Sequence, residues 1–512
     1  MLASGFTGLT DKIGRITNHG IAGPQTPPVS HPLTESLSMT VSLSFSEEGG
    51  PMNIPKSGRE ISSKWAEYIL RAHMAVAGTP AFLQVDNCTV SEDLGDGYNS
   101  QVVFFSVDTT EREETSSPDV KKTYHLVAKL LKENPQFKVL NKKFKIGLKE
   151  YLVYTDLISN LNNILSVKAP EVPQISLPKL IYGKCTSNEF ALVMENLQHA
   201  GYEMNDKRKG FDAEQLMAAV KRIAIVHAVS SVFLQTADTS KYSCFPTAQE
   251  YMNTLNIMMG VSLEISIEFL KSSKENEELG KKIESCKSSL LEKASAALLS
   301  DYPVKCLAHG DLWNNNIMLK YSDAPDEQKI IEEVKIIDWG NTSWGPPIFD
   351  LQYLVHTSTN RAVRKENLDE VLSHYHSTFM TLTTQLGYPP GKWDLSDFKA
   401  EWEKSYPLGF LLGCCLTAGT LSTTNPANKK PEPSILDKPL LLPLKVLVNG
   451  MKLGMFKVLM PVFMSSGGKK LFAGLLRKLL QPTLEELKSG KNEAMNTRLL
   501  ELLYEADENG LL

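Results

Sequence analysis

Two short segments carry residue types and spacings that suit phosphoryl transfer. The segment 309–317 reads HGDLWNNNI, and the segment 336–340 reads IIDWG. Asn316 stands five positions after Asp311, and Asp338 stands 27 positions after Asp311. The reaction needs an acceptor hydroxyl held in line and a divalent metal held against the phosphates. Carboxylate and amide oxygens are the ligands that Mg²⁺ prefers, so the two segments predict a phosphoryl-transfer site.

The spacing assigns a role to each of these residues. Asp311 is predicted to accept or orient the proton of the acceptor hydroxyl, and Asn316 and Asp338 are predicted to hold Mg²⁺. The alternative is a loop that contains only turn-forming Asn and Asp residues. The five-residue Asp–Asn step, the apolar strand after it and the second Asp argue against that alternative. His309 is expected to bond the loop backbone rather than to act as an acid or base.

A kinase also needs a cover for the phosphates. Two predicted strands, 82–94 and 101–108, are joined by a turn whose backbone amides could approach phosphate because glycine has no Cβ. Gly-Asp-Gly is also a common hairpin turn, so the turn alone is weak evidence. The predicted nucleotide flap consists of Gly95, Asp96, Gly97, Tyr98, Asn99 and Ser100.

A cation and an adenine site complete the predicted nucleotide pocket. Lys129, on a third strand, could reach the α- and β-phosphates, and Glu150, on the following helix, could pair with it. Each residue could equally be solvated, but the order flap, Lys, Glu upstream of Asp311 strengthens the kinase interpretation. The segment 193–197 reads VMENL. It is predicted to be the hinge, where the backbone near Glu195 and Leu197 would bond the adenine edge.

The elements that must position these residues change in kind near residue 197. The first part has alternating, β-branched and aromatic runs that predict strands, with helices at 62–77 and 144–161 and a strand pair at 177–185 and 189–194. After residue 197, the helical spacing of apolar residues predicts helices. The first of them, 212–234, is expected to be capped by Asp212. Short strands are expected at 316–320 and 330–337. The other expected helices are 247–273, 275–300, 349–358, 361–385, 395–421, 440–460 and 483–506.

This outline predicts an α+β, two-lobed, protein-kinase-like fold with a small antiparallel-sheet N-lobe and a large, mainly helical C-lobe. The predicted boundaries are a disordered leader at 1–55, an N-lobe at 56–197, a C-lobe at 198–430 and a helical extension at 431–512. The leader is rich in Ser, Thr, Gly and Pro, a composition that cannot bury enough surface to fold.

Composition narrows the class of protein. The chain has 512 residues, 54 Lys and Arg against 59 Asp and Glu, and 42% hydrophobic residues. These are globular values without the basic excess of a nucleic-acid-binding protein. Seven cysteines without a CxxC pair predict buried thiols in a reducing, cytoplasmic setting. We expect no secretory signal, no membrane span in 405–428 or 440–464, no nucleic acid and no obligate protein partner.

The motif residues resemble a known family. The chain is similar to the aminoglycoside-phosphotransferase and choline-kinase group, and more narrowly to the ecdysteroid kinase-like, or CHK kinase-like, proteins of arthropods. The resemblance spans about 80–425 and rests on HGDLW at 309–313 with Asn315 and Asn316. Further matches are IDW at 337–339, PIFDLQYL at 347–354, and His227 with Ala228 late in a long helix.

The resemblance implies a protein-kinase-like fold, ATP and Mg²⁺ as cofactors, and the roles already given to Asp311, Asn316, Asp338, Lys129 and Glu150. It also implies that Asp350 braces the catalytic loop. The family often has Asp-Phe-Gln where this chain has DWG at 338–340, and Glu-Asp-Leu where it has ENL at 195–197. Neither change removes a metal ligand or the base.

The expected activity is therefore phosphorylation of a hydroxyl on a small molecule, with an ecdysteroid, another steroid or a hydroxylated xenobiotic as the leading acceptor. Absence of an Asp-Phe-Gly to Ala-Pro-Glu activation segment argues against a protein kinase. A choline or ethanolamine kinase is the alternative enzyme. A pseudokinase that binds a hydrophobic ligand is the alternative of another class, and the intact Asp311, Asn316, Asp338 and Lys129 argue against it.

Overall fold

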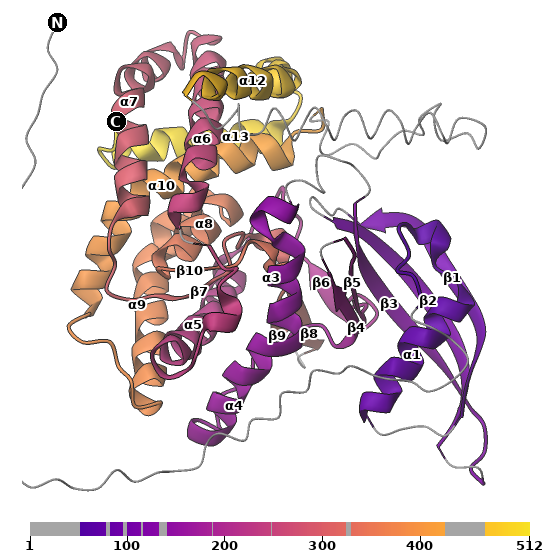
Figure 1. Ribbon diagram of the computed structural model, residues 1–512. Helices are drawn as coiled ribbons and strands as arrows, with labels where there is room; N and C mark the ends of the chain where they lie inside the picture. Colours follow the sequence, from indigo (N-terminus) through magenta and orange to yellow (C-terminus); the bar gives the residue numbers. More distant parts are fainter. Residues whose placement is uncertain are drawn as a thin grey trace, which may run out of the picture. The chain divides into compact units, whose positions relative to one another are not determined.

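The N-terminal part of the fold is a five-stranded antiparallel sheet with strand order β1-β2-β3-β5-β4 (Figure 1). The computed structural model describes residues 52–77, 82–95, 100–113, 116–132, 141–186, 188–246, 248–323, 329–424 and 466–512. The strands are β1 (Phe82–Gly95), β2 (Ser100–Arg112), β3 (Val120–Leu131), β4 (Leu180–Cys185) and β5 (Phe190–Glu195). Helix α1 (Ser63–Ala77) packs on β1 and β4. The predicted strands and first helix are confirmed.

Side-chain alternation buries both faces of this sheet. Ala191 and Val193 of β5 belong to the core under α1, whereas Leu192 and Met194 belong to the core that continues into the helical part. Successive strand residues point to opposite faces, so Lys129 of β3 faces away from α1, because its neighbours Ala128 and Leu130 belong to the α1 core. Lys129 is thereby turned to the face whose core, with its partner Leu192, continues into the helical part.

The helix that carries Glu150 covers the other face of the sheet (Figure 1). It comprises α3 (Ile146–Leu152), a π-helical turn at Val153–Leu157 and α4 (Ile158–Lys168), and so is longer than the predicted 144–161. Beyond the hinge lie β6 (Tyr202–Met204), β8 (Ile317–Asp323) and β9 (Lys329–Ile336), which form a sheet of order β6-β8-β9. A second small pair joins β7 (Cys306–Ala308) to β10 (Ser343–Gly345).

The remaining described elements are helices that enclose a second part of the core. Asp212 caps α5 in a capping box with Gln215, as predicted. Helix α5 is long and apolar enough to cross a membrane, but 78% of its most apolar window is buried within the protein, as in the core helix of a globular fold. The helices are α5 (Ala213–Thr236), α6 (Ala248–Lys271), α7 (Glu277–Leu299), α8 (Ile348–Ser358), α9 (Arg361–Gln385), α10 (Leu395–Leu421), α12 (Ser466–Ser489) and α13 (Glu493–Glu508).

The prediction of one helix at 483–506 is wrong. The chain forms α12 and α13 with a break between them, because Gly490 adopts a left-handed φ of 66° and the Asn492 side chain caps α13 by accepting from Met495 N–H. A positive φ is the common way in which a helix ends at glycine. The predicted helix 440–460 lies outside the described residues, as do 1–51 of the predicted leader; Ile54 and Pro55, at its end, are buried.

A buried carboxylate, Glu486, joins the ends of three helices. It accepts hydrogen bonds from the Ser422 and Thr423 hydroxyls, the Thr424 N–H and the Asn492 amide at 2.6–3.2 Å. Burial alone would raise the pKa of Glu486, but these donors lower it to about 2. The ionised carboxylate therefore stabilises the junction of α10, α12 and α13.

Replacing Glu486 by glutamine is expected to lower the free energy of unfolding at pH 7 by about 2–3 kcal/mol. Because the folded-state pKa is depressed, the stabilisation is present above the unfolded pKa of about 4.3 and is lost as pH falls toward 2. Denaturant unfolding of wild type and Glu486→Gln at pH 7 and at pH 3 measures the loss in free energy of unfolding at each pH. Glu485→Gln, which changes an exposed neighbour, is the control. A loss that is equal at both pH values would contradict the role of the carboxylate.

Candidate active site

Lys129 lies between two carboxylates that come from distant parts of the chain. Its Nζ donates to Glu150 Oε1 at 2.5 Å and to Asp338 Oδ1 at 2.9 Å. Burial alone would lower the pKa of Lys129, but the Asp338 and Glu150 carboxylates raise it above its usual value. Lys129 therefore remains a cation, and the structure brings the predicted Lys, Glu and metal-site Asp together.

The loop that carries Asp311 is held by a buried aspartate on α8. Asp350 accepts the backbone N–H of His309 at 2.6 Å and of Gly310 at 2.9 Å. His227 Nε2 donates to the same carboxylate at 3.1 Å, because an ionised carboxylate only accepts, and His227 Nδ1 lies 2.8 Å from the Tyr375 hydroxyl. Burial would raise the pKa of Asp350, but His227 lowers it below its usual value. An ionised Asp350 thus fixes the start of the loop.

His309 bonds the backbone on both sides of its ring. Asp311 N–H donates to Nδ1 at 3.2 Å, so Nε2 carries the proton and donates to the Ile337 carbonyl at 2.9 Å. The ring also packs edge-on against buried Trp339 with centroids 4.6 Å apart. His309 therefore links the loop of Asp311 to the strand end that precedes Asp338.

Gly310 is required by the shape of the loop. Its φ is 75°, and a Cβ at this position would lie 2.5 Å from the Asn341 carbonyl oxygen. A left-handed conformation costs an L-residue about 1–2 kcal/mol before any clash. The backbone contact fixes the distance between the Asp311 loop and the segment after Asp338.

Gly310→Ala is expected to lower the free energy of unfolding by more than about 2 kcal/mol and to impair activity, because strain and clash act together beside Asp311. Gly387→Ala is the matched control, since Gly387 has a φ of 86° but nothing within 4 Å of a new Cβ. Unfolding midpoints of the two variants measure the difference. Equal losses would show that the contact with Asn341 does not constrain the loop.

The carboxylate of Asp311 is held by side chains outside its own loop. The Tyr353 hydroxyl donates to Oδ1 at 2.5 Å, and Asn341 Nδ2 lies 3.4 Å from Oδ2. Burial raises the pKa of Asp311, the charge of Asp338 adds to the rise, and the Tyr353 bond opposes it. The sequence did not identify Tyr353 or Asn341 as site residues.

Asp338 occupies a strained backbone position. It is one of two described non-glycine residues with a positive φ, at 66°. Burial would raise the pKa of its carboxyl, but the Lys129 ammonium lowers it below the usual value. Gly340, two residues on, would place a Cβ 2.6 Å from Ile146 Cγ2 of α3. Glycine at this position thus lets the helix of Glu150 pack closely against the segment of Asp338.

The donors near Asp311 fit magnesium. Asn316 Nδ2 donates to the Asp311 carbonyl at 2.8 Å, so its amide oxygen is the atom left for a cation. Asp338 uses Oδ1 for Lys129, which leaves Oδ2. Hard oxygen donors without His or Cys suit Mg²⁺, which needs few protein ligands because it keeps waters. The pair that was predicted from spacing can therefore hold Mg²⁺.

The structure describes the two ends of the predicted flap and the whole of the predicted hinge. Gly95 ends β1 opposite Val102, and Ser100 begins β2 opposite Leu131, so the flap joins the two strands as predicted. The tip of the flap, Asp96, Gly97, Tyr98 and Asn99, lies outside the described residues. At the hinge, Glu195 ends β5 and Leu197 is buried.

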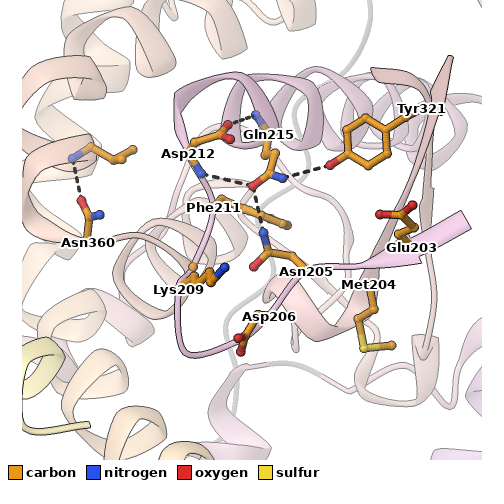
Figure 2. A pocket seen from close by; sticks show the side chains of 12 residues that line it. Glu203, Met204, Asn205, Asp206, Lys209, Phe211, Asp212, Gln215, Tyr321 and Asn360 are labelled. Atoms are coloured by element: carbon orange, nitrogen blue, oxygen red, sulfur yellow. Dashed lines mark hydrogen bonds between the residues drawn. The ribbon is translucent and has the colours of Figure 1, made fainter. Parts of the chain in front are cut away.

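A separate pocket lies between the segment 203–215 and residues 321, 360 and 363. It has a volume of about 510 Å³, and none of the predicted site residues lines it. Figure 2 shows Gln215 at its wall, where its side chain joins Asp212, Asn205 and the Tyr321 hydroxyl. Asn205 in turn accepts from the Asn314 amide of the loop at 3.3 Å. These mutual bonds make the pocket wall a support for the loop.

The sheet, the hinge and the helical part with its embedded loop define an α+β, two-lobed, protein-kinase-like fold. The sequence matches the ecdysteroid kinase-like family over residues 94–388. The chain belongs to this family, which confirms the resemblance that its motifs indicated.

Comparison with solved structures finds small-molecule kinases. An ethanolamine kinase of Plasmodium vivax has 9% identity and a TM-score of 0.32, covering 64% of this chain and 75% of that chain. A choline/ethanolamine kinase family protein of Mesorhizobium loti has 11% identity and a TM-score of 0.31, covering 86% and 99%. Aminoglycoside 2′-phosphotransferase-IIIa has 16% identity and a TM-score of 0.30, covering 67% and 96%.

A comparison with curated protein sequences finds no match.

Proposed function

We propose that this protein is an ATP- and Mg²⁺-dependent kinase that transfers the γ-phosphate to a hydroxyl of a small molecule. The observation that carries the proposal is the double ion pair of Lys129 with Glu150 and Asp338. It unites β3, α3 and the segment after β9 beside Asp311. A buried ion pair often stabilises a fold no better than apolar packing does. The two ion pairs of Lys129 are therefore better explained by binding of the nucleotide phosphates than by stability.

Each residue has a definite task in this proposal. Lys129, oriented by Glu150, would contact the nucleotide phosphates, and the hinge backbone near Glu195 and Leu197 would bond adenine. Asp338 and Asn316 would hold Mg²⁺, which when bound supplies positive charge against the phosphate oxygens. Asp311 would accept the proton of the acceptor hydroxyl, while its loop is held by Asp350 and His309.

The acceptor we propose is an ecdysteroid, another steroid or a hydroxylated xenobiotic, and we propose a cytoplasmic location. Membership of the ecdysteroid kinase-like family supports the acceptor class. Free thiols at all seven cysteines are compatible with a reducing compartment.

A panel of acceptors tests the acceptor class. Purified protein, ATP and Mg²⁺ would be incubated with ecdysteroids, sterols, phenolic and glycosidic xenobiotics, choline and ethanolamine, and kcat/KM would be compared across classes. The expected result is the highest kcat/KM for a hydroxylated steroid or xenobiotic. A preference for choline or ethanolamine would replace this acceptor class. Absence of Mg²⁺-dependent ATP binding would instead favour a pseudokinase and overturn the proposed function.

A further inference from the structure

Tyr353 lies against the proposed catalytic base although no sequence motif assigned it a role. Its hydroxyl donates to Asp311 Oδ1 at 2.5 Å, a length typical of a strong, charge-assisted bond. We propose that Tyr353 is the positioning residue of Asp311 and that it leaves Oδ2 to receive the proton of the acceptor. This inference rests on the proposed kinase function.

The Asp311 carboxylate needs such a partner. Rotation about the last side-chain torsion of aspartate is broad, so a fixed backbone does not fix the two oxygens. The bonds of His309 and Asn316 reach only the backbone of Asp311, through its N–H and its carbonyl. The Asn341 amide is 3.4 Å from Oδ2, a longer and weaker contact. Tyr353 therefore makes the short bond that orients the carboxylate.

Helix α8 supports both the loop backbone and the Asp311 side chain. Asp350 and Tyr353 stand three residues apart, so they lie on the same face of the helix. Asp350 accepts the His309 and Gly310 N–H groups, and one turn later Tyr353 reaches Asp311. At the helix end, Ser358 Oγ accepts the Asn314 N–H at 2.9 Å. One helix thus sets the loop from residue 309 to residue 314.

The bond also assigns the two oxygens of Asp311. In the transfer step, the acceptor oxygen forms a bond to the γ-phosphorus as the bond from that phosphorus to the ADP oxygen breaks, and the acceptor proton passes to Asp311. Oδ1 is engaged by Tyr353, so Oδ2 takes that proton. Burial and the Asp311 carboxylate raise the pKa of Tyr353 well above its usual value. Tyr353 therefore keeps its own proton and remains a donor.

Tyr353→Phe tests this assignment because it removes the hydroxyl and keeps the ring. The expected result is a fall in kcat of about tenfold to a hundredfold, the effect of one hydrogen bond to a charged group. KM for ATP and KM for the acceptor should stay near their wild-type values, because Tyr353 acts through Asp311. The matched control is Tyr242→Phe, since the Tyr242 hydroxyl also donates to an aspartate, Asp156, at 2.5 Å.

The outcomes separate the possible roles. A lower kcat in Tyr353→Phe, at an unfolding midpoint similar to that of Tyr242→Phe and with the kcat of Tyr242→Phe unchanged from wild type, would support positioning. An increased acceptor KM at unchanged kcat would show that Tyr353 binds the acceptor, and an unchanged or higher kcat would show that the bond is not used; either overturns the assignment. Wild-type protein that transfers no phosphate to any acceptor would overturn the proposed function itself, and this assignment with it.

Discussion

Asp311→Asn is expected to slow phosphoryl transfer by about a hundredfold to ten-thousandfold, the usual contribution of a general base. Asparagine has nearly the shape of aspartate and can still accept the Tyr353 hydroxyl bond, but it cannot take the acceptor proton. Burial and the charge of Asp338 raise the pKa of Asp311. Loss of the charge should therefore leave folding at least as stable at pH 7.

Three measurements check this expectation: kcat on the best acceptor, the dissociation constant for Mg²⁺ and ATP, and the unfolding midpoint. Asp156→Asn is the control, because Asp156 also accepts a 2.5 Å bond from a tyrosine hydroxyl but lies outside the proposed site. Nucleotide affinity should stay within about twofold of wild type, since the change removes an interaction of the transfer step. Transfer at the wild-type rate by Asp311→Asn would show that another group accepts the proton.

Asp338→Asn is expected to abolish most of the Mg²⁺-dependent part of ATP affinity. Mutation of residues that only hydrogen-bond to a metal ligand lowers the affinity for the metal about tenfold to a hundredfold. Loss of a direct ligand should therefore lower it at least as much. Asparagine tolerates the left-handed backbone better than other non-glycine residues, so the φ of 66° at this position can be kept. Lys129 retains Glu150 as a partner at 2.5 Å.

Calorimetric titration of ATP with Mg²⁺ and with a chelator isolates this effect. The two proteins should bind ATP similarly in the chelator and differently in Mg²⁺. Asp338→Ala also removes the carboxylate but places alanine in a strained backbone conformation. Comparing it with Asp338→Asn separates the effect of the lost carboxylate from the effect of backbone strain. Equal Mg²⁺ dependence in wild type and Asp338→Asn would refute the metal role.

The short-range features of the site could be predicted from sequence because they depend on spacing along one element. Alternation and β-branched residues were enough to place Lys129 on a strand, and the step from Asp311 to Asn316 was enough to propose a shared loop. The side of α3 on which Glu150 lies also follows from helical periodicity. That Lys129, Glu150 and Asp338 form ion pairs depends on the tertiary packing of their elements and is seen only in the structure.

Other features depended on contacts that sequence periodicity does not describe. Tyr353 lies within the motif that carried Asp350, but its bond to Asp311 requires the relative placement of α8 and the loop. The three-residue strands β6 and β10 are too short to show alternation. Gly490 and Asn492 did mark the break between α12 and α13 locally, as a helix-ending glycine and a capping residue. The long apolar period across 483–506 outweighed these residues in the prediction.

We propose that the cluster of Lys129, Glu150, Asp338 and Asp311 transfers phosphate to a small-molecule hydroxyl. Its most direct test is transfer of labelled γ-phosphate from ATP to the acceptor panel, with Mg²⁺ and with a chelator, using wild type and Asp311→Asn. We expect label in one acceptor class, dependent on Mg²⁺ and nearly absent in the variant. Label that forms equally with the chelator or in Asp311→Asn, or no label in any acceptor, would contradict it.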